Sequence, residues 1–164
     1  MFSLFKPKDP SIIASPVTGT VHPLSECQDL AFSGGALGDG VIFRYEGSYV
    51  LAPCSGTVVS VAKTNHAVSL LCDNGAELLI HVGFDTVMLN CEGLRALVSK
   101  RQRVRAGQRL IEIDREYMEE KHIDLTTPMV VTNSDDVQME ILCSTGEVKA
   151  RKTPIFRCSK KGGE

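Results

Sequence analysis

The sequence predicts an all-β fold, a compact antiparallel β-sandwich or barrel with two short helical segments. Short runs rich in β-branched residues alternate with glycine and proline along the chain. An Asp73-Asn74-Gly75 turn joins two apolar, alternating runs, which is a strong signal for a β-hairpin. The motif Ser15-Pro-Val-Thr-Gly-Thr-Val21 returns as Ala52-Pro-Cys-Ser-Gly-Thr-Val58. Such a repeat is expected when two half-domains of similar plan form one β structure.

The predicted strands follow one another at close spacing. They cover residues 20–21, 40–45, 49–51, 56–62, the two hairpin arms between 66 and 81, 108–113, 129–132 and 152–157. One helical segment is predicted at about 93–99. A second begins after Asp114, a candidate N-cap, with Glu116 in its first turn and Lys121 and His122 in its last, as the helix dipole favours. His22 is assigned to a loop.

Length and composition predict a single domain in the cytoplasm. The chain has 164 residues, of which 43% are hydrophobic, and a net charge of −2. The expected domain covers 12–158, between a flexible tail at 1–11 and a C-terminal tail at 159–164. No basic cluster indicates nucleic-acid binding. No signal peptide is visible, and no apolar run approaches the ~20 residues of a membrane span. The six cysteines show no CxxC pair, so they are interpreted as buried free thiols.

Two histidines lie near the ends of the hairpin arms, and their pairing decides whether they meet. A two-residue loop at Asp73-Asn74 places His66 opposite His81, and a loop at Asn74-Gly75 makes them diagonal neighbours. Either loop puts both on one face, roughly 5–8 Å apart. An odd-length loop with a bulge would break this parity. If the parity holds, two imidazoles converge on one site.

Three chemistries could use a pair of imidazoles. Zinc would need at least one further ligand, for which Asp85 is the nearest candidate, and no HxH or HExxH element is present. Acid–base work with a serine or cysteine would need a nucleophile in an activating context, and no GxSxG turn exists. Nucleophilic phosphoryl transfer by histidine fits better, because a second imidazole can donate a hydrogen bond to the phosphoryl group. Thr64 could hold the other nitrogen of His66.

Several motifs together resemble the glucose-type enzyme IIA domain of the bacterial phosphoenolpyruvate:sugar phosphotransferase system. The resemblance extends over residues 12–158. Its most specific part is the pattern of Thr64-Asn-His-Ala67 followed by His81-Val-Gly-Phe-Asp-Thr86. Further matches are Ala52-Pro-x-x-Gly-Thr-Val58, Gly38-Asp-Gly40, Arg103-Val-x-x-Gly107 and Thr127-Pro128.

The resemblance implies specific roles for the catalytic residues. His81 matches the phosphorylated histidine, His66 its partner, and Thr64 the residue that orients His66. The phosphoryl group would come from the phosphocarrier protein HPr and pass to a cysteine on the IIB domain of a sugar permease. Contact with the membrane would therefore be peripheral, through the permease only. No metal or other cofactor is implied beyond the covalent phosphohistidine.

The resemblance also implies a docking surface around the histidines. Asp29 and Asp85 match acidic residues beside the site, and an apolar rim is typical of transient interfaces. The rim and the loop after the histidine are matched by Phe32, Leu79, Val82 and Gly83.

Two other function classes stay open. The Ala-Pro-x-x-Gly-x-Val motif also resembles biotinyl and lipoyl carrier domains, but no lysine occupies the hairpin turn. A zinc hydrolase of related duplicated-β plan is the second alternative.

Overall fold

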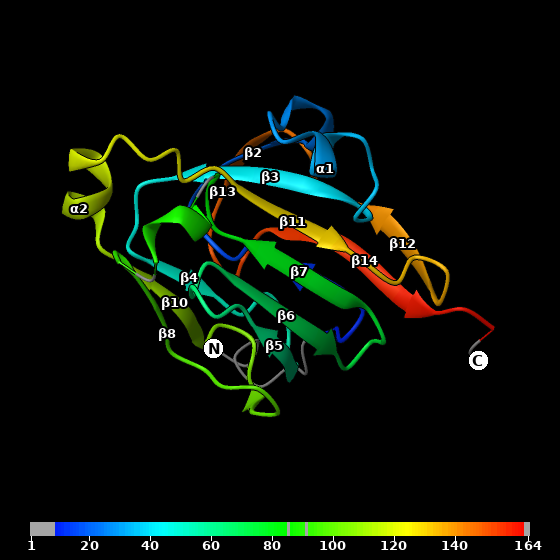
Figure 1. Ribbon diagram of the computed structural model, residues 1–164. Helices are drawn as coiled ribbons and strands as arrows, with labels where there is room; N and C mark the ends of the chain where they lie inside the picture. Colours follow the sequence, from blue (N-terminus) through cyan, green and yellow to red (C-terminus); the bar gives the residue numbers. More distant parts are fainter. Residues whose placement is uncertain (1–8, 85, 91, 163–164) are drawn as a thin grey trace, which may run out of the picture.

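The computed structural model describes residues 9–84, 86–90 and 92–162, which form three antiparallel sheets. The large sheet has the order β13-β2-β3-β11-β7-β6-β5-β9, and the small sheets are β1-β14-β12 and β4-β10-β8 (Figure 1). The strands are β1 (Ile12–Ala14), β2 (Gly19–Pro23), β3 (Asp39–Tyr45), β4 (Tyr49–Leu51), β5 (Gly56–Val61), β6 (Ala67–Cys72), β7 (Glu77–His81), β8 (Leu94–Ala96), β9 (Arg103–Val104), β10 (Arg109–Ile113), β11 (Thr127–Val131), β12 (Val137–Ile141), β13 (Gly146–Val148) and β14 (Pro154–Lys160). The predicted all-β class is confirmed.

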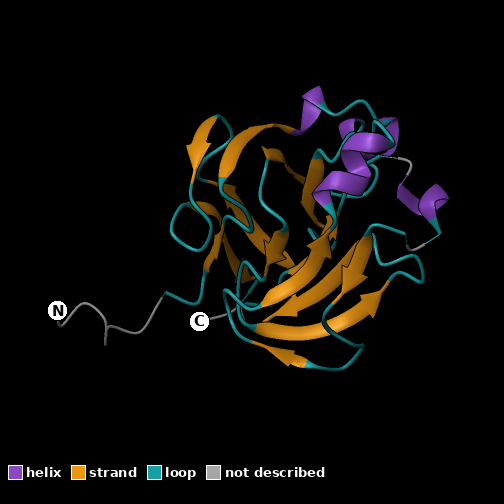
Figure 2. Ribbon diagram, turned by 90° about the vertical axis from the view of Figure 1, so that its left-hand side faces the viewer, coloured by secondary structure: helices purple, strands orange, loops and turns teal. Residues whose placement is uncertain are grey.

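The helical segments lie on the periphery of the β structure, all of them toward the upper right in Figure 2. They are the 3₁₀ turns η2 (Leu24–Glu26) and η3 (Thr86–Leu89) and the short helices α1 (Leu30–Ser33) and α2 (Arg115–Glu120). In Figure 1, α2 and α1 lie apart from each other. The segment η3 follows the end of β7 in the chain, and α1 packs through Phe32 onto the outer face of the large sheet. Of these segments, η3 and α1 lie next to the end of β7, where the site is formed.

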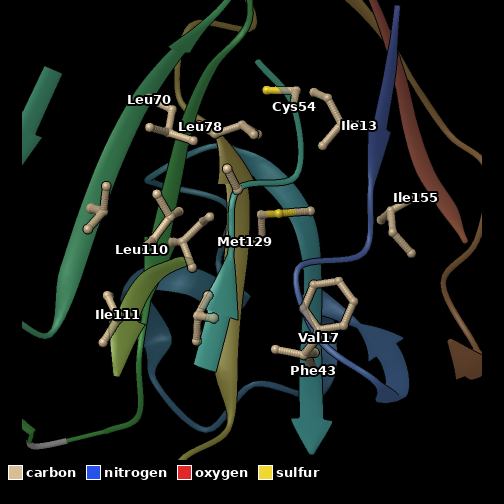
Figure 3. Packing of buried hydrophobic residues seen from close by; sticks show 14 of the residues in the cluster. Ile13, Val17, Phe43, Cys54, Leu70, Leu78, Leu110, Ile111, Met129 and Ile155 are labelled. Atoms are coloured by element: carbon tan, nitrogen blue, oxygen red, sulfur yellow. The ribbon is translucent and has the colours of Figure 1, made fainter. Parts of the chain in front are cut away.

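One hydrophobic core fills the space between the sheets (Figure 3). Phe43 of β3, Leu78 of β7, Leu110 of β10 and Phe156 of β14 are fully buried, so every sheet contributes to the same core. Each fully buried side chain of this size contributes roughly 1.5–3 kcal/mol. The core therefore fixes the strands whose ends form the site.

A smaller apolar cluster lies on the opposite, outer face of the large sheet. Ile42 and Val130 pack there against Leu24, Cys27 and Phe32. The strand β11 is consequently buried along its whole length, which explains its continuous apolar run.

The predicted helix at 93–99 is wrong, because Leu94–Ala96 forms strand β8. It pairs with β10 through Leu94 opposite Ile113 and Ala96 opposite Ile111. The second predicted helix is confirmed: the Asp114 carboxylate accepts a hydrogen bond from the Tyr117 amide at the start of α2. The helix ends at Glu120, so Lys121 and His122 follow it and do not occupy its last turn.

Two further expectations need correction. His22 lies within β2, not in a loop, and its Nε2 forms a 2.8 Å hydrogen bond with the Thr20 hydroxyl. At the C-terminus, β14 continues to Lys160 and pairs there with Val137, so the sheet extends past the expected boundary at 158.

The interpretation of all six cysteines as buried free thiols is wrong in part. Cys54, in the segment between β4 and β5, forms a disulfide with Cys72, the last residue of β6. Cys27 and Cys158 are free and buried, whereas Cys143 is free but only half-buried. Cys91 lies outside the described residues. The pairing of Cys54 with Cys72 comes from the folding of one hairpin arm against β5, which the cysteine spacing does not reveal.

The repeated motif places a glycine at the start of a strand in both copies. Gly19 begins β2 and Gly56 begins β5. A Cβ on Gly19 would lie 2.1 Å from the Arg44 carbonyl oxygen, and one on Gly56 would lie 2.3 Å from that of Leu71. In each copy the neighbouring strand approaches so closely that a side chain cannot fit. The two copies of the motif therefore share a glycine because each strand start packs closely against the neighbouring strand.

We expect Gly56→Ala to lower the free energy of unfolding by about 1–3 kcal/mol, because the added methyl group must displace a paired strand. Urea denaturation followed by circular dichroism measures the change. Gly47→Ala is the matched control, since its Cβ would meet nothing within 4 Å. Equal effects from the two substitutions would contradict the steric explanation.

Candidate functional site

His81 is the last residue of β7, and its ring lies on the outer face of the large sheet. Ile80 before it is fully buried, and His81 itself is half-buried. Its Nδ1 lies 2.9 Å from the Gly83 carbonyl oxygen. Since a carbonyl oxygen only accepts, Nδ1 of the neutral ring carries the proton. The available lone pair of the neutral ring is consequently on Nε2.

The loop after β7 is fixed so that the Gly83 carbonyl faces the ring. Gly83 has φ +78°, and a Cβ there would lie 2.6 Å from Thr86 Cγ2 and 2.8 Å from the Asp124 carbonyl oxygen. Only glycine meets both the conformation and the space. The buried Thr86 hydroxyl donates to the Val82 carbonyl at 2.6 Å and closes the turn. Gly83 and Thr86 of this segment thus have a local structural reason.

His66 and His81 converge as expected, although the pairing differs from both predicted registers. Ala67, not His66, lies opposite His81. The hairpin loop has three residues, with Gly75 at φ +97°. Strict alternation along β6 would then put His66 on the core face. His66 precedes the strand, however, and Asn65 before it has φ +62°.

The two imidazole rings meet edge to face. Their centroids are 4.7 Å apart and their planes are inclined by 78°. The Val82 amide donates to the His66 carbonyl at 2.6 Å, which joins the backbones of the two segments beside the rings. Both rings are half-buried, so the pair is open to solvent on one side.

Thr64 lies where it can fix the second ring. Its hydroxyl oxygen is 2.6 Å from Nδ1 of His66. If the hydroxyl donates this bond, the proton of the neutral His66 ring is on Nε2. That nitrogen then becomes a hydrogen-bond donor next to His81. The structure therefore brings together His81, His66 and Thr64, the three residues predicted to carry the chemistry.

Burial of the rings lowers the pKa of both imidazoles. For His81 burial is the largest effect, opposed by the Gly83 carbonyl and the charge of Asp29. For His66 burial again comes first, followed by the nearby charge of His81. A lowered pKa keeps both rings neutral at neutral pH, which is the state that a nucleophilic imidazole requires.

The residues predicted for the partner surface differ in how far they are buried. Phe32 is only 2% exposed, and its ring centroid lies 5.3 Å from that of His81. Leu79 is half-buried. Val82 is fully buried in the main core, and Gly83 is buried as well. Neither side chain is therefore exposed at the site: Phe32 of α1 packs onto the outer face of the large sheet beside His81, and Val82 packs in the main core.

Of the two acidic residues, only one can be placed. Asp29 is the N-cap of α1, and its Oδ1 accepts a 2.9 Å hydrogen bond from the Ala31 amide. Asp85 lies outside the described residues. Two exposed apolar residues were not predicted: Leu30 on α1 is 82% exposed and Met88 on η3 is 79% exposed. Segments of four residues are too short to show an amphipathic pattern, so the sequence contained little signal for either.

The histidine geometry agrees with the comparison to known families. Residues 11–137 match the family described as "phosphoenolpyruvate-dependent sugar phosphotransferase system, EIIA 1". The chain belongs to this family. As an EIIA domain it is a phosphoryl-transferring component of the sugar phosphotransferase system, and the carrier and zinc hydrolase alternatives are not favoured.

Similar proteins include fused permeases and one solved EIIA-type structure. The chain is 37% identical over 149 residues to the N-acetylglucosamine-specific EIICBA component of Klebsiella pneumoniae, covering 91% of this chain and 23% of that protein. It is 45% identical over 123 residues to the glucose-specific EIIBCA component of Corynebacterium glutamicum, covering 75% and 18%. The glucose permease IIA of Mycoplasma capricolum superposes with a TM-score of 0.81 at 32% identity, covering 88% of this chain and 94% of that one.

Against both curated relatives this EIIA domain spans less than a quarter of the full length. Within its described residues, no helix has the length and apolar character needed to cross a membrane.

We expect His66 and His81 of this EIIA domain to titrate below 6.5, the ordinary histidine pKa, because burial penalises the charged rings. As the pH falls, these histidines then take up protons in the unfolded chain before they do so in the folded one. The free energy of unfolding is therefore highest above pH 6.5 and decreases as the pH drops below this value. A ¹H–¹⁵N NMR titration of the histidine side chains measures the midpoints. The same titration in urea is the control, and midpoints of the folded chain at or above those in urea would contradict the expectation.

Proposed function

We propose that His81 accepts a phosphoryl group from phosphorylated HPr on Nε2 and passes it to a cysteine on the IIB domain of a sugar permease. The observation that carries this assignment is the hydrogen bond from His81 Nδ1 to the Gly83 carbonyl, which leaves Nε2 as the free nucleophile. The names of the relatives, EIICBA and EIIBCA components, support a partner of the IIB type. HPr as the donor rests on the family resemblance.

The transfer exchanges one P–N bond for another. The Nε2 lone pair of His81 attacks phosphorus while the bond to the donor histidine breaks, and the proton on Nδ1 stays hydrogen-bonded to Gly83. In the second step a cysteine thiolate of the IIB domain takes the phosphoryl group and His81 regains its lone pair. No cofactor takes part beyond the covalent phosphohistidine.

His66 serves as a donor toward the phosphoryl oxygens. In a loose transition state charge lies on three oxygens, so a positioned N–H lowers the barrier. The 4.7 Å separation of the ring centroids leaves the phosphoryl group within reach of both rings. Thr64 acts through His66 and is a positioning residue.

The partner surface is proposed to include the exposed Leu30 and Met88. They lie on α1 and η3, the segments that flank the histidine loop, and Asp29 supplies a charge for a basic group of the partner. Leu79 and Asp85 complete the proposed rim. Exposed apolar residues with an ionic anchor suit an interface that forms and dissociates rapidly. The proposal places the transfer in the cytoplasm, and it reaches the membrane only through the permease.

We expect His81→Ala to accept no phosphoryl group from phosphorylated HPr, because the nucleophile is gone. His66→Gln should still be phosphorylated but should pass the group on much more slowly, because only a stabilising donor is altered. Incubation with phosphoenolpyruvate, enzyme I and HPr, followed by detection of acid-labile phosphate, measures the first step. Addition of a IIB domain then measures the onward transfer. His22→Ala, a partly exposed histidine on the same sheet, is the control and should transfer normally. Phosphate found on His66 would reverse the proposed roles.

We expect Thr64→Val to slow onward transfer by about tenfold while His81 is still phosphorylated, since one hydrogen bond to His66 is lost. The rate of transfer to a IIB domain measures the effect. Thr20→Val is the matched control, because Thr20 makes the same kind of bond to His22, away from His81. Equal slowing in both variants would rule out a specific role for Thr64.

A further inference from the structure

A groove of about 990 Å³ lies apart from the histidines. It is bordered by the start of β2, the connection from β3 to β4, the start of β10 and residues 150–151. Neither His66 nor His81 lines it, and in the large sheet β11 separates β3, which borders the groove, from β7, which carries His81. The groove is therefore separate from the histidine site.

Three arginines line the groove: Arg44, Arg109 and Arg151. All three are exposed, and none of them forms an ion pair with a carboxylate of the described residues. Other arginines of the chain do form such pairs, as Arg95 does with Glu112. Among the described lining residues Glu46 is the one acidic side chain. The groove thus carries a local positive charge on a chain whose net charge is −2.

The guanidinium of Arg109 is held in place without an acidic partner. It lies 3.8 Å above the centroid of the Tyr49 ring. The Tyr49 hydroxyl donates to Glu112 at 3.0 Å, and Glu112 already pairs with Arg95. Stacking on a ring uses the flat face of a guanidinium and leaves its N–H edge available. Arg109 is consequently preorganised to donate to a ligand in the groove.

Arg151 is positioned by the backbone of Gly107. A Cβ on that glycine would lie 2.3 Å from Arg151 Nε and 2.9 Å from its Cζ. Because Gly107 has no side chain, the guanidinium of Arg151 has room to lie against it, just before β10. Arg44 is opposite Thr20 in the β2–β3 pair, so it borders the groove from a rigid strand.

We propose that this groove binds a small organic phosphate that carries at least two negative charges. Guanidinium groups present paired N–H donors that match phosphate oxygens. Thr18 and Ser48 offer hydroxyl groups, and Val17 and Leu51 form an apolar wall, so the lining suits a hydroxylated organic part as well as the phosphate. The volume is typical of sites for small ligands and cofactors.

NMR titration of the ¹⁵N-labelled chain tests the proposal with three probes: inorganic pyrophosphate, glucose 6-phosphate and ATP. We expect the backbone amides of residues 18–20, 47–49 and 107–109 to shift, and affinity to fall with rising salt. Arg44→Gln, Arg109→Gln and Arg151→Gln should each weaken binding by about tenfold. The probe that binds best identifies whether the organic part resembles a sugar or a nucleotide.

Matched controls separate specific binding from a general effect of charge. Arg105→Gln removes the same charge from an exposed arginine outside the groove and should bind as the unaltered chain does. His81→Ala should also bind normally, because the groove is independent of the histidines. Thermal unfolding by circular dichroism checks that each variant folds. If Arg109→Gln does not fold, Arg44→Gln, at an exposed strand position, is used to test the proposal. Absence of groove shifts at millimolar concentrations of all three probes would overturn the proposal. Equal weakening by Arg105→Gln, or pyrophosphate binding as tightly as both organic probes, would do the same.

Discussion

The proposed chemistry of this EIIA domain depends on one hydrogen bond, from His81 Nδ1 to the Gly83 carbonyl oxygen. It decides which ring nitrogen carries the proton and therefore which one can attack phosphorus. The bond exists because Gly83 adopts a positive φ in a space that admits no side chain, and because Thr86 closes the turn beneath it. Lowered pKa values then keep the rings neutral where transfer must occur. Local backbone geometry and burial thus both favour a neutral His81 ring with its lone pair on Nε2.

The sandwich explains how so small a site is held rigid. Leu78 and Ile80 anchor β7 in the main core, while Phe32 packs beside His81 on the outer face of the sheet. The strand is therefore fixed on both faces up to its last residue, and the histidine projects from the point where this packing ends. The proposed nucleophile is half-buried at this position, and it loses little conformational freedom when a partner docks.

Sequence reasoning predicted the fold class and the histidine pair for physical reasons that are local. A turn and alternating apolar runs define a hairpin, whatever the rest of the chain does. The strand register could not be predicted from the sequence. The hairpin loop has three residues, which by alternation alone would put His66 on the opposite face from His81, and the left-handed conformation of Asn65 brings the two histidines together again. The depth of Phe32 and Val82, the exposure of Leu30 and the Cys54–Cys72 disulfide all depend on which segments pack together in space. The segment at 93–99 was misread because the strand β8 is only three residues long.

The most direct test of the account is to locate the phosphoryl group on the ring. Phosphorylated chain labelled with ¹⁵N in its histidines can be examined by NMR for coupling between phosphorus and individual ring nitrogens. The account predicts coupling to Nε2 of His81, with Nδ1 still protonated. Coupling to Nδ1 of His81, or to either nitrogen of His66, would contradict it.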